Sequence, residues 1–535
     1  MFFQKKSTKI ISAVLVVAVM LAVTMPVTAN VPYVAYAYDW WWETYPVQSG
    51  YVVDRVITAN ELGMRMTTPQ DLFIYDDPDT GESIIFIVDS GNNRILISDL
   101  DFKDVRELKT FTYSDDYQVQ NFLEHDTEGA VIDSSREVFW EEVKKIGTET
   151  TLSNPQGIHV TNYHGETRVY IADHGNERVL AGDLDGNIWM EYRRPPVSDT
   201  YREDQSFQPS KVLTDNAGNV YICIKTITDG AVVFSEQGVF LGFFGANRVT
   251  RTTDAMLNYV LRHLPFVSRE MMAQRTRPVP VEFSNFTVDE DDQFIYTVTE
   301  TRSTNLDIVK KLNPAGQNIF EEQGYDGMIW GDFTQPYVYG RSFSSQIVDI
   351  SIDHRKDIYL LDRESCKIFQ YDQEGHLMFI FAGKGEQKGL FNTPVALEAH
   401  NDRVYVLDEN KNSLTIFKLT EFGELVVEAM GLFNSGLYSE SLEPWSDVLQ
   451  RDANYYLAYI GMGNAKLSIG EFGEALDYLH MHSRGGYNRA FKDFRINYIR
   501  ENFDKMLIVA SAVLVLLIGG GIAVKVVKKR KSSEG

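Results

Sequence analysis

The sequence PQDL at residues 69–72 begins a pattern that continues with the apolar run IIFIV at residues 84–88 and the turn DSGNNRI at residues 89–95. A second copy has the same three parts in the same order: PQGI at residues 155–158, VYIA at residues 169–172 and DHGNERV at residues 173–179. Short apolar runs bounded by Asp, Asn and Gly turns are typical of β-strands. Because the unit recurs, the sequence predicts a repeat architecture in which each unit buries its apolar face against the next.

Weaker copies of the same pattern extend it along the chain. They lie at residues 209–224, 294–298, 357–369 and 394–408, which brings the number of units to six. The Pro-x-Gly/Asp-aliphatic start and the Asp-x-Gly-Asn-x-Arg-aliphatic turn resemble the NHL repeat, a unit of six- or seven-bladed β-propellers. The resemblance implies a mainly β protein, with a six-bladed NHL-type β-propeller over residues 51–431.

Six polar residues of the two strong turns are the candidate site residues of the repeat. An Asp or Asn in a turn can accept hydrogen bonds from exposed backbone N–H groups, and an Arg can reach a carboxylate or carbonyl across the strand pair. These properties favour a structural role over a catalytic one. The residues are Asp89, Asn92 and Arg94 in the first copy and Asp173, Asn176 and Arg178 in the second.

A strand-like segment before the first full repeat predicts how the ring closes. Residues 51–57 read YVVDRVI, and this segment could complete the last blade. Pairing of the two ends would remove the exposed edge strands of an open sheet.

Two long insertions interrupt the repeats. The two strong turns are separated by a charged stretch at residues 115–149, which is either a degenerate blade or an insertion; the absence of a clear strand-turn-strand pattern favours an insertion. Residues 255–272 have apolar side chains at helical spacing. Long loops on a rigid scaffold often carry function, so both are candidate contact regions for a partner.

Both ends of the chain carry membrane-related signals. Residues 1–29 have the basic, apolar and small-residue regions of a secretory signal peptide, and an uncleaved anchor is the alternative. Residues 506–524 contain no charge and are long enough to cross a bilayer as a helix. The basic segment at residues 525–535 follows, and the positive-inside rule places it in the cytoplasm. The sequence therefore predicts a single-pass cell-membrane protein with its bulk outside the cell.

Two further segments lie between these signals and the propeller. Residues 30–50 form an aromatic linker that includes three consecutive tryptophans, and packing on a neighbouring domain is the favoured interpretation. Residues 432–503 change to helical periodicity and resemble one tetratricopeptide helix pair, with the small residues Gly461 and Ala465 allowing close approach. This short helical segment is expected to serve as a stalk between the propeller and the transmembrane helix.

The formal net charge of −24 makes the chain strongly acidic, which disfavours binding to nucleic acid. No phosphate-binding loop, zincin motif or nucleophile elbow is present in the sequence. Similar propellers include gluconolactonase-like hydrolases with a channel metal, but their ligand set has no counterpart here that can be matched residue by residue. The sequence therefore identifies no catalytic and no cofactor-binding residues. Binding of a divalent metal in the channel is kept as an alternative.

Three functions follow from these observations. The leading hypothesis is a noncatalytic, membrane-anchored extracellular binding or scaffold protein that engages a protein or carbohydrate partner. A metal-dependent gluconolactonase-like hydrolase is the first alternative, and a surface sensor that signals through a membrane partner is the second. The order of signal, propeller, helical repeat and C-terminal span also resembles surface proteins that accompany bacterial sugar ABC import systems, which implies a role accessory to sugar uptake.

Overall fold

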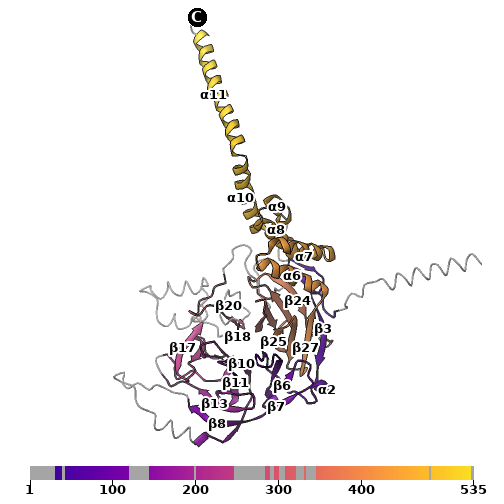
Figure 1. The fold of residues 1–535 in the computed structure, drawn as a ribbon, viewed down its shortest axis with the longest axis vertical. Helices are drawn as coiled ribbons and strands as arrows, with labels where there is room; N and C mark the ends of the chain where they lie inside the picture. The colour runs from indigo at the N-terminus through magenta and orange to yellow at the C-terminus, as the bar shows by residue number, and fades with distance from the viewer. Residues whose placement is uncertain are drawn as a thin grey trace, which may run out of the picture.

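Six β-sheets form the blades of a ring, and a column of helices follows it (Figure 1). The computed structural model describes residues 31–38, 43–119, 144–197, 200–245, 284–289, 294–300, 308–320, 330–332, 345–480 and 483–531. The predicted six-bladed propeller, mainly β and followed by helices, is confirmed. The signal peptide, the three tryptophans and residues 255–272 lie outside the described residues.

The first three blades follow the repeat order of the sequence. Blade 1 consists of β4 (Asp71–Asp76), β5 (Ser83–Asp89), β6 (Arg94–Asp99) and β7 (Arg106–Leu108). Blade 2 contains β10 (Gly157–Tyr163), β11 (Glu166–Asp173), β12 (Arg178–Gly182) and β13 (Asn187–Arg193). Blade 3 contains β14 (Pro209–Thr214), β15 (Val220–Ile224), β16 (Gly230–Phe234) and β17 (Phe240–Gly245).

The weaker sequence copies form the other three blades. Blade 4 contains β18 (Asn285–Val288), β19 (Ile295–Val298) and β20 (Val309–Leu312). Blade 5 contains β21 (Ile347–Ile352), β22 (Ile358–Asp362), β23 (Lys367–Tyr371) and β24 (Leu377–Ala382). Blade 6 contains β25 (Pro394–His400), β26 (Arg403–Asp408) and β27 (Ser413–Leu419), and its outer strand is β3 (Tyr51–Ile57).

The ring closes through the N-terminal strand β3. This strand pairs antiparallel with β27, with Tyr51 opposite Leu419 and Ile57 opposite Leu414. The outer edge of blade 6 is therefore formed by residues that precede blade 1 in the chain. The structure thus confirms that residues 51–57 complete the last blade. Their pairing with β27 joins the two ends of the repeat array and covers the edge of that strand.

A separate apolar core fills each contact between neighbouring blades. Blades 1 and 2, for example, share a cluster that includes Phe86, Ile95, Ile158 and Val169, all almost fully buried. Corresponding clusters join each other pair of neighbours around the ring. Alternating apolar positions in the strands supply these contacts, because successive side chains point to opposite faces of a blade.

The charged stretch at residues 115–149 does not form a blade of its own in the described part of the chain. Its ends belong to β8 (Thr110–Val119) and β9 (Glu149–Thr151), which extend blade 2 to six strands. Strand β8 runs parallel to β13 and antiparallel to β9. The insertion expected from the sequence is therefore anchored on the outer edge of blade 2.

The helical region begins earlier than the boundary expected at Gly431, which lies inside a helix. Strand β27 ends at Leu419, and α6 (Glu421–Asn434) starts directly after it, with Thr420 as its N-cap. The Thr420 hydroxyl accepts a hydrogen bond from the Gly423 amide at 3.1 Å. The apolar residues of α6 lie on one helix face. In the sequence their helical spacing follows directly after strand patterns, so the start of the helix was not recognised.

Six helices follow the propeller in the described part of the chain. They are α6, α7 (Tyr438–Arg451), α8 (Tyr456–Ser468), α9 (Phe472–Leu479), α10 (Arg484–Glu501) and α11 (Phe503–Lys531). Helices α6 to α8 pack against blades 5 and 6 through a core that includes Phe379, Trp445 and Tyr455. The Tyr455 hydroxyl donates to the Met378 carbonyl at 2.7 Å, so the helical unit is joined to the propeller by a buried hydrogen bond as well as by packing.

The last helix extends away from the propeller as a continuation of α10 (Figure 1). Residues Phe503–Lys529 of α11 are long and apolar enough to cross a membrane, with a mean hydropathy of 2.7 and no part of the most apolar window buried. The structure therefore has one candidate membrane-spanning helix, at the C-terminal end, among the described residues.

The aromatic linker contributes a small hairpin that touches both parts of the protein. It consists of β1 (Tyr36–Tyr38) and β2 (Thr44–Pro46). The Tyr36 hydroxyl donates to Asp332 at 2.6 Å, and the Tyr45 ring lies 4.5 Å from the Tyr456 ring in α8. A short α2 (Ala59–Leu62) follows β3.

Candidate functional site

The turn residues of the first strong repeat bond to one another inside blade 1. The fully buried Asp89 carboxylate accepts from the Thr67 amide at 2.7 Å, from Asn92 Nδ2 at 2.8 Å and from Arg94 Nε at 2.7 Å. Arg94 also reaches Glu107 at 2.6 Å. The aspartate thus joins the β5–β6 turn to the loop that enters the blade.

The second strong repeat has the same arrangement and more partners. Asp173 accepts from the Ser153 amide at 2.7 Å, from Asn176 Nδ2 at 2.8 Å and from Arg178 Nε at 2.7 Å. The Arg178 side chain is only 5% exposed, and it also lies 3.3 Å from a Glu191 carboxylate that is 1% exposed. Neither turn contributes to the two pockets of the central channel described below.

The centre of the propeller holds a polar channel of about 350 Å³ that is lined by the innermost strand of every blade. Several charged or titratable side chains line it. Lys211 of blade 3 forms an ion pair with Asp71 of blade 1, and Asp349 of blade 5 accepts from the Leu397 amide at 2.7 Å. Glu398 of blade 6 also lines the channel.

Burial controls the protonation of these channel groups. It raises the pKa of Asp349 to about 6, although the nearby Lys211 ammonium acts in the opposite direction. Burial also raises the pKa of Asp71 and raises the pKa of Glu398 well above its usual range. The pKa of the buried His159 is lowered to about 4 for the same reason, so its imidazole is neutral at physiological pH.

The channel residues do not fit a divalent metal site of the kind implied by the hydrolase resemblance. A lysine ammonium already supplies the cation beside Asp71, and Asp349 accepts from the Asn285 side-chain amide and from the backbone. In the described part of the chain, no group of three or more His, Cys, Asp or Glu side chains is arranged to hold a metal ion. Such a site would need several of these oxygens to be free to coordinate.

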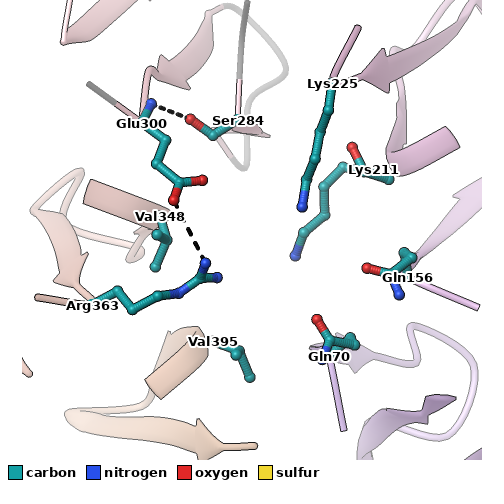
Figure 2. A pocket seen from close by; sticks show the side chains of 10 residues that line it. Gln70, Gln156, Lys211, Lys225, Ser284, Glu300, Val348, Arg363 and Val395 are labelled. Carbon is teal, nitrogen blue, oxygen red and sulfur yellow. Dashed lines mark hydrogen bonds and ion pairs between the residues drawn. The ribbon is translucent and has the colours of Figure 1, made fainter. Parts of the chain in front are cut away.

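A second, smaller pocket forms the mouth of the channel at the end where the innermost strands begin (Figure 2). We call this the mouth pocket. Each blade contributes to it the residue at the same repeat position, at the start of the innermost strand. These six residues are Gln70, Gln156, Ser210, Ser284, Val348 and Val395.

Charged side chains from blades 3, 4 and 5 complete the mouth pocket. Lys225 and Arg363 directly follow the second strands of blades 3 and 5, and Glu300 lies two residues beyond that of blade 4. Figure 2 shows Lys211, Lys225 and Arg363 pointing into the same space. Lys211 lines both the mouth pocket and the channel, so its ion pair with Asp71 stands between the two.

The charges of the mouth pocket are only partly compensated. Arg363 lies 3.5 Å from Glu300, and its Nε atom is buried without a hydrogen-bond partner among the described residues. Glu300 also accepts from the Gln346 side chain. Lys225 is exposed and has neither a hydrogen bond nor an ion pair in the described part of the structure.

Sequence reasoning identified the turn residues but not the mouth pocket. The signal that could have found it is the repeat frame itself. Gln70 and Gln156 each follow the repeat proline, and Ser210 follows Pro209. Placing these equivalent positions on one ring would have brought them together, whereas Lys225 and Arg363 lie in weaker copies whose turns do not match the strong pattern.

No protein-family model matches the sequence, and no curated protein matches it. Several solved structures are similar to the propeller at low sequence identity. A selenomethionine-substituted virginiamycin B lyase from Staphylococcus aureus is 13% identical, with a TM-score of 0.37, and the match covers 68% of this chain and 99% of that one. A catalytically inactive variant of virginiamycin B lyase from Staphylococcus aureus, solved with quinupristin, is 14% identical, with a TM-score of 0.37 and coverage of 69% and 100%. A streptogramin B lyase is 10% identical, with a TM-score of 0.36 and coverage of 69% and 98%.

Proposed function

We propose that this protein is a noncatalytic binding protein, held at the outer face of the cell membrane by α11, whose propeller binds its ligand at the mouth pocket. The observation that carries the proposal is the convergence of polar side chains from five of the six blades on one opening, with donors that have no partner among the described residues. Binding sites in rigid scaffolds commonly combine a concave surface with a few convergent polar groups. A propeller provides such a surface at little ordering cost, because the blades already hold each residue in place.

The membrane anchor is supported by the apolar segment of α11 and by the basic residues that follow it. Under the positive-inside rule these residues lie in the cytoplasm, and the propeller then lies outside. Helices α6 to α10 would hold the mouth pocket at a set distance from the bilayer. In this proposal the repeats are of the NHL type, the helical unit is tetratricopeptide-like, and the ligand is a carbohydrate or a protein at the cell surface in support of sugar uptake.

The site of binding is tested by blocking the mouth pocket. Gln156→Trp places a large ring in the opening, whereas Glu166→Trp alters a residue that is 76% exposed at the opposite end of the same blade. The full chain in nanodiscs is assayed by calorimetry against a panel of bacterial and plant oligosaccharides and against a sugar-import substrate-binding protein. We expect Gln156→Trp to abolish the binding seen with the unaltered chain and Glu166→Trp to preserve it. Equal binding by both variants would place the ligand elsewhere.

A further inference from the structure

We propose that the mouth pocket is an anion site, in which Lys225 and Arg363 bind a carboxylate or phosphate group carried by the ligand. The inference rests on the proposed function, since it names the chemistry that the same opening recognises. It predicts that the opening prefers anionic ligands, which neither the propeller fold nor the acidic composition of the chain would suggest.

Two cationic side chains at the mouth pocket have donors without acceptors among the described residues. The Arg363 Nε atom is buried and unpaired within the described residues, and the Lys225 ammonium has no partner there. A donor that is buried without an acceptor costs about 1–3 kcal/mol, and an anion bound to the exposed part of the guanidinium would offset part of that cost. A guanidinium also presents its N–H groups in a planar fork, which matches two oxygens of a carboxylate or phosphate.

The local charge at the mouth pocket is opposite in sign to that of the whole chain. The chain carries a net charge of −24, yet three of the four charged side chains around the mouth pocket are cations. Lys211 is occupied by Asp71, which leaves Lys225 and Arg363 against the single carboxylate of Glu300. That carboxylate lies 3.5 Å from Arg363, at the edge of ion-pair contact, and therefore acts as an internal competitor for an external anion.

The mouth pocket is small and lies at the end of the channel. Its volume is about 30 Å³, so it admits one small group and leaves the rest of a larger ligand outside. The amide side chains of Gln70 and Gln156 line the same space and offer further N–H donors. The Lys211–Asp71 pair forms the inner limit. An anionic group would thus stop at the mouth and would not pass into the channel.

The test compares matched probes on the full chain in nanodiscs. D-glucuronate and glucose 6-phosphate each carry an anionic group, and glucose is the neutral counterpart. Binding is measured by calorimetry at low and high ionic strength for the unaltered chain and for Lys225→Gln, Glu300→Gln and Lys109→Gln. Lys109 is the control, because it is an exposed lysine without a partner among the described residues and lies on the outer part of blade 1, away from the mouth.

Replacing Lys225 and replacing Glu300 with the neutral glutamine should change the affinity for an anionic probe in opposite directions. Lys225→Gln should weaken binding of an anionic probe about tenfold, the equivalent of one charged hydrogen bond. Glu300→Gln should strengthen it, because the internal competitor is removed, and high salt should weaken it. Lys109→Gln should leave it unchanged. A preference for glucuronate over the sugar phosphate identifies the anion as a carboxylate, and the reverse preference identifies a phosphate.

Two outcomes would overturn the anion site. One is binding of glucose as tight as that of both anionic probes; the other is anion binding that Lys225→Gln and Glu300→Gln leave unchanged. If neutral oligosaccharides bind and Gln156→Trp blocks them, the proposed function stands and the anion site alone fails. If anionic probes bind with the expected variant pattern while no oligosaccharide or protein binds, the anion site stands and the broader partner class fails.

Discussion

At the scale of single residues, Asp173 and Arg178 show how one repeat turn is stabilised. Arg178 is almost completely buried and faces the buried carboxylates of Asp173 and Glu191. The surrounding cations and a Lys145 hydrogen bond outweigh burial, and the pKa of Glu191 is lowered to about 2. The turn is therefore a network of charges that depend on one another, since removal of Arg178 leaves the Asp173 carboxylate buried without a cation.

We expect Arg178→Ala to lower the free energy of unfolding by about 3–5 kcal/mol, because it leaves the buried Asp173 carboxylate without a cation and removes one of the cations around Glu191. Arg94→Ala should cost less, about 1–3 kcal/mol, because Arg94 is 12% exposed and its partner Glu107 is 46% exposed. Unfolding of the full chain in detergent, followed by tryptophan fluorescence in denaturant, gives both values. An unchanged midpoint for Arg178→Ala combined with lost ligand binding would instead show that this arginine has a functional role.

His159 in the channel gives the stability of the fold a defined dependence on pH. Its folded pKa of about 4 lies below the ordinary value of 6.5, so the unfolded chain takes up a proton first as the pH falls. This contribution to stability is complete above pH 6.5 and is lost as the pH falls towards 4, by up to about 3 kcal/mol. His159→Gln should therefore lose less stability than the unaltered chain between pH 7 and pH 5. His164→Gln, at an exposed turn, is the control and should behave like the unaltered chain.

At the scale of elements, two glycines in the helical unit occupy opposite environments. A Cβ atom at Gly461 in α8 would lie 2.5 Å from the Trp445 ring of α7, whereas a Cβ at Gly431 in α6 would meet nothing within 4 Å. Gly461 therefore permits the close contact between α7 and α8. Trp445 in turn belongs to the core that joins these helices to blades 5 and 6.

The same substitution at the two glycines should change stability in opposite directions. Gly461→Ala forces the Trp445 ring to move, and we expect a loss of about 1–3 kcal/mol. Gly431→Ala should add about 0.5–1 kcal/mol, because alanine loses less backbone entropy than glycine when a helix forms. Thermal unfolding followed by circular dichroism at 222 nm reports on the helices directly. A gain at both positions would mean that α7 and α8 are not packed as the structure shows.

At the scale of the whole molecule, one chain combines a closed ring, a helical column and an apolar terminal helix (Figure 1). The column is anchored to the ring by α6, which starts directly after the last strand of blade 6. The N-terminal hairpin contacts the column as well, through Tyr45 and Tyr456. Because blade 6 also contains the closing strand β3, the ring seam and the attachment of the helices lie in the same part of the protein.

We expect protease added to intact protoplasts to remove the propeller and to leave a protected fragment that contains α11. The physical reason is that α11 is apolar over a membrane-spanning length and the basic residues after it favour the cytoplasm. An antibody against a C-terminal tag and one against the propeller distinguish the fragments on a blot. Lysed cells are the control, in which the C-terminal tag should also be removed. A propeller that resists protease in intact protoplasts would reverse the orientation.

The sequence by itself determined the features that depend on short stretches of chain. Two strong repeats and four weaker ones predicted six blades, because each blade is a local unit with its own turn chemistry. The closing strand and the terminal apolar helix were predicted for the same reason, since pattern and length identify both. The start of α6 was misplaced where helix and strand patterns adjoin, at residues 420–431.

Only the tertiary structure decided which side chains meet in the channel and at its mouth. Asp71 and Lys211 are 140 residues apart, and Lys225 and Arg363 come from blades that share no direct neighbour contact. Their encounter depends on ring closure, which brings equivalent positions of distant repeats to one axis. A local pattern carries no information about which charges will face one another there, because that depends on the number of blades and on the residue that each contributes.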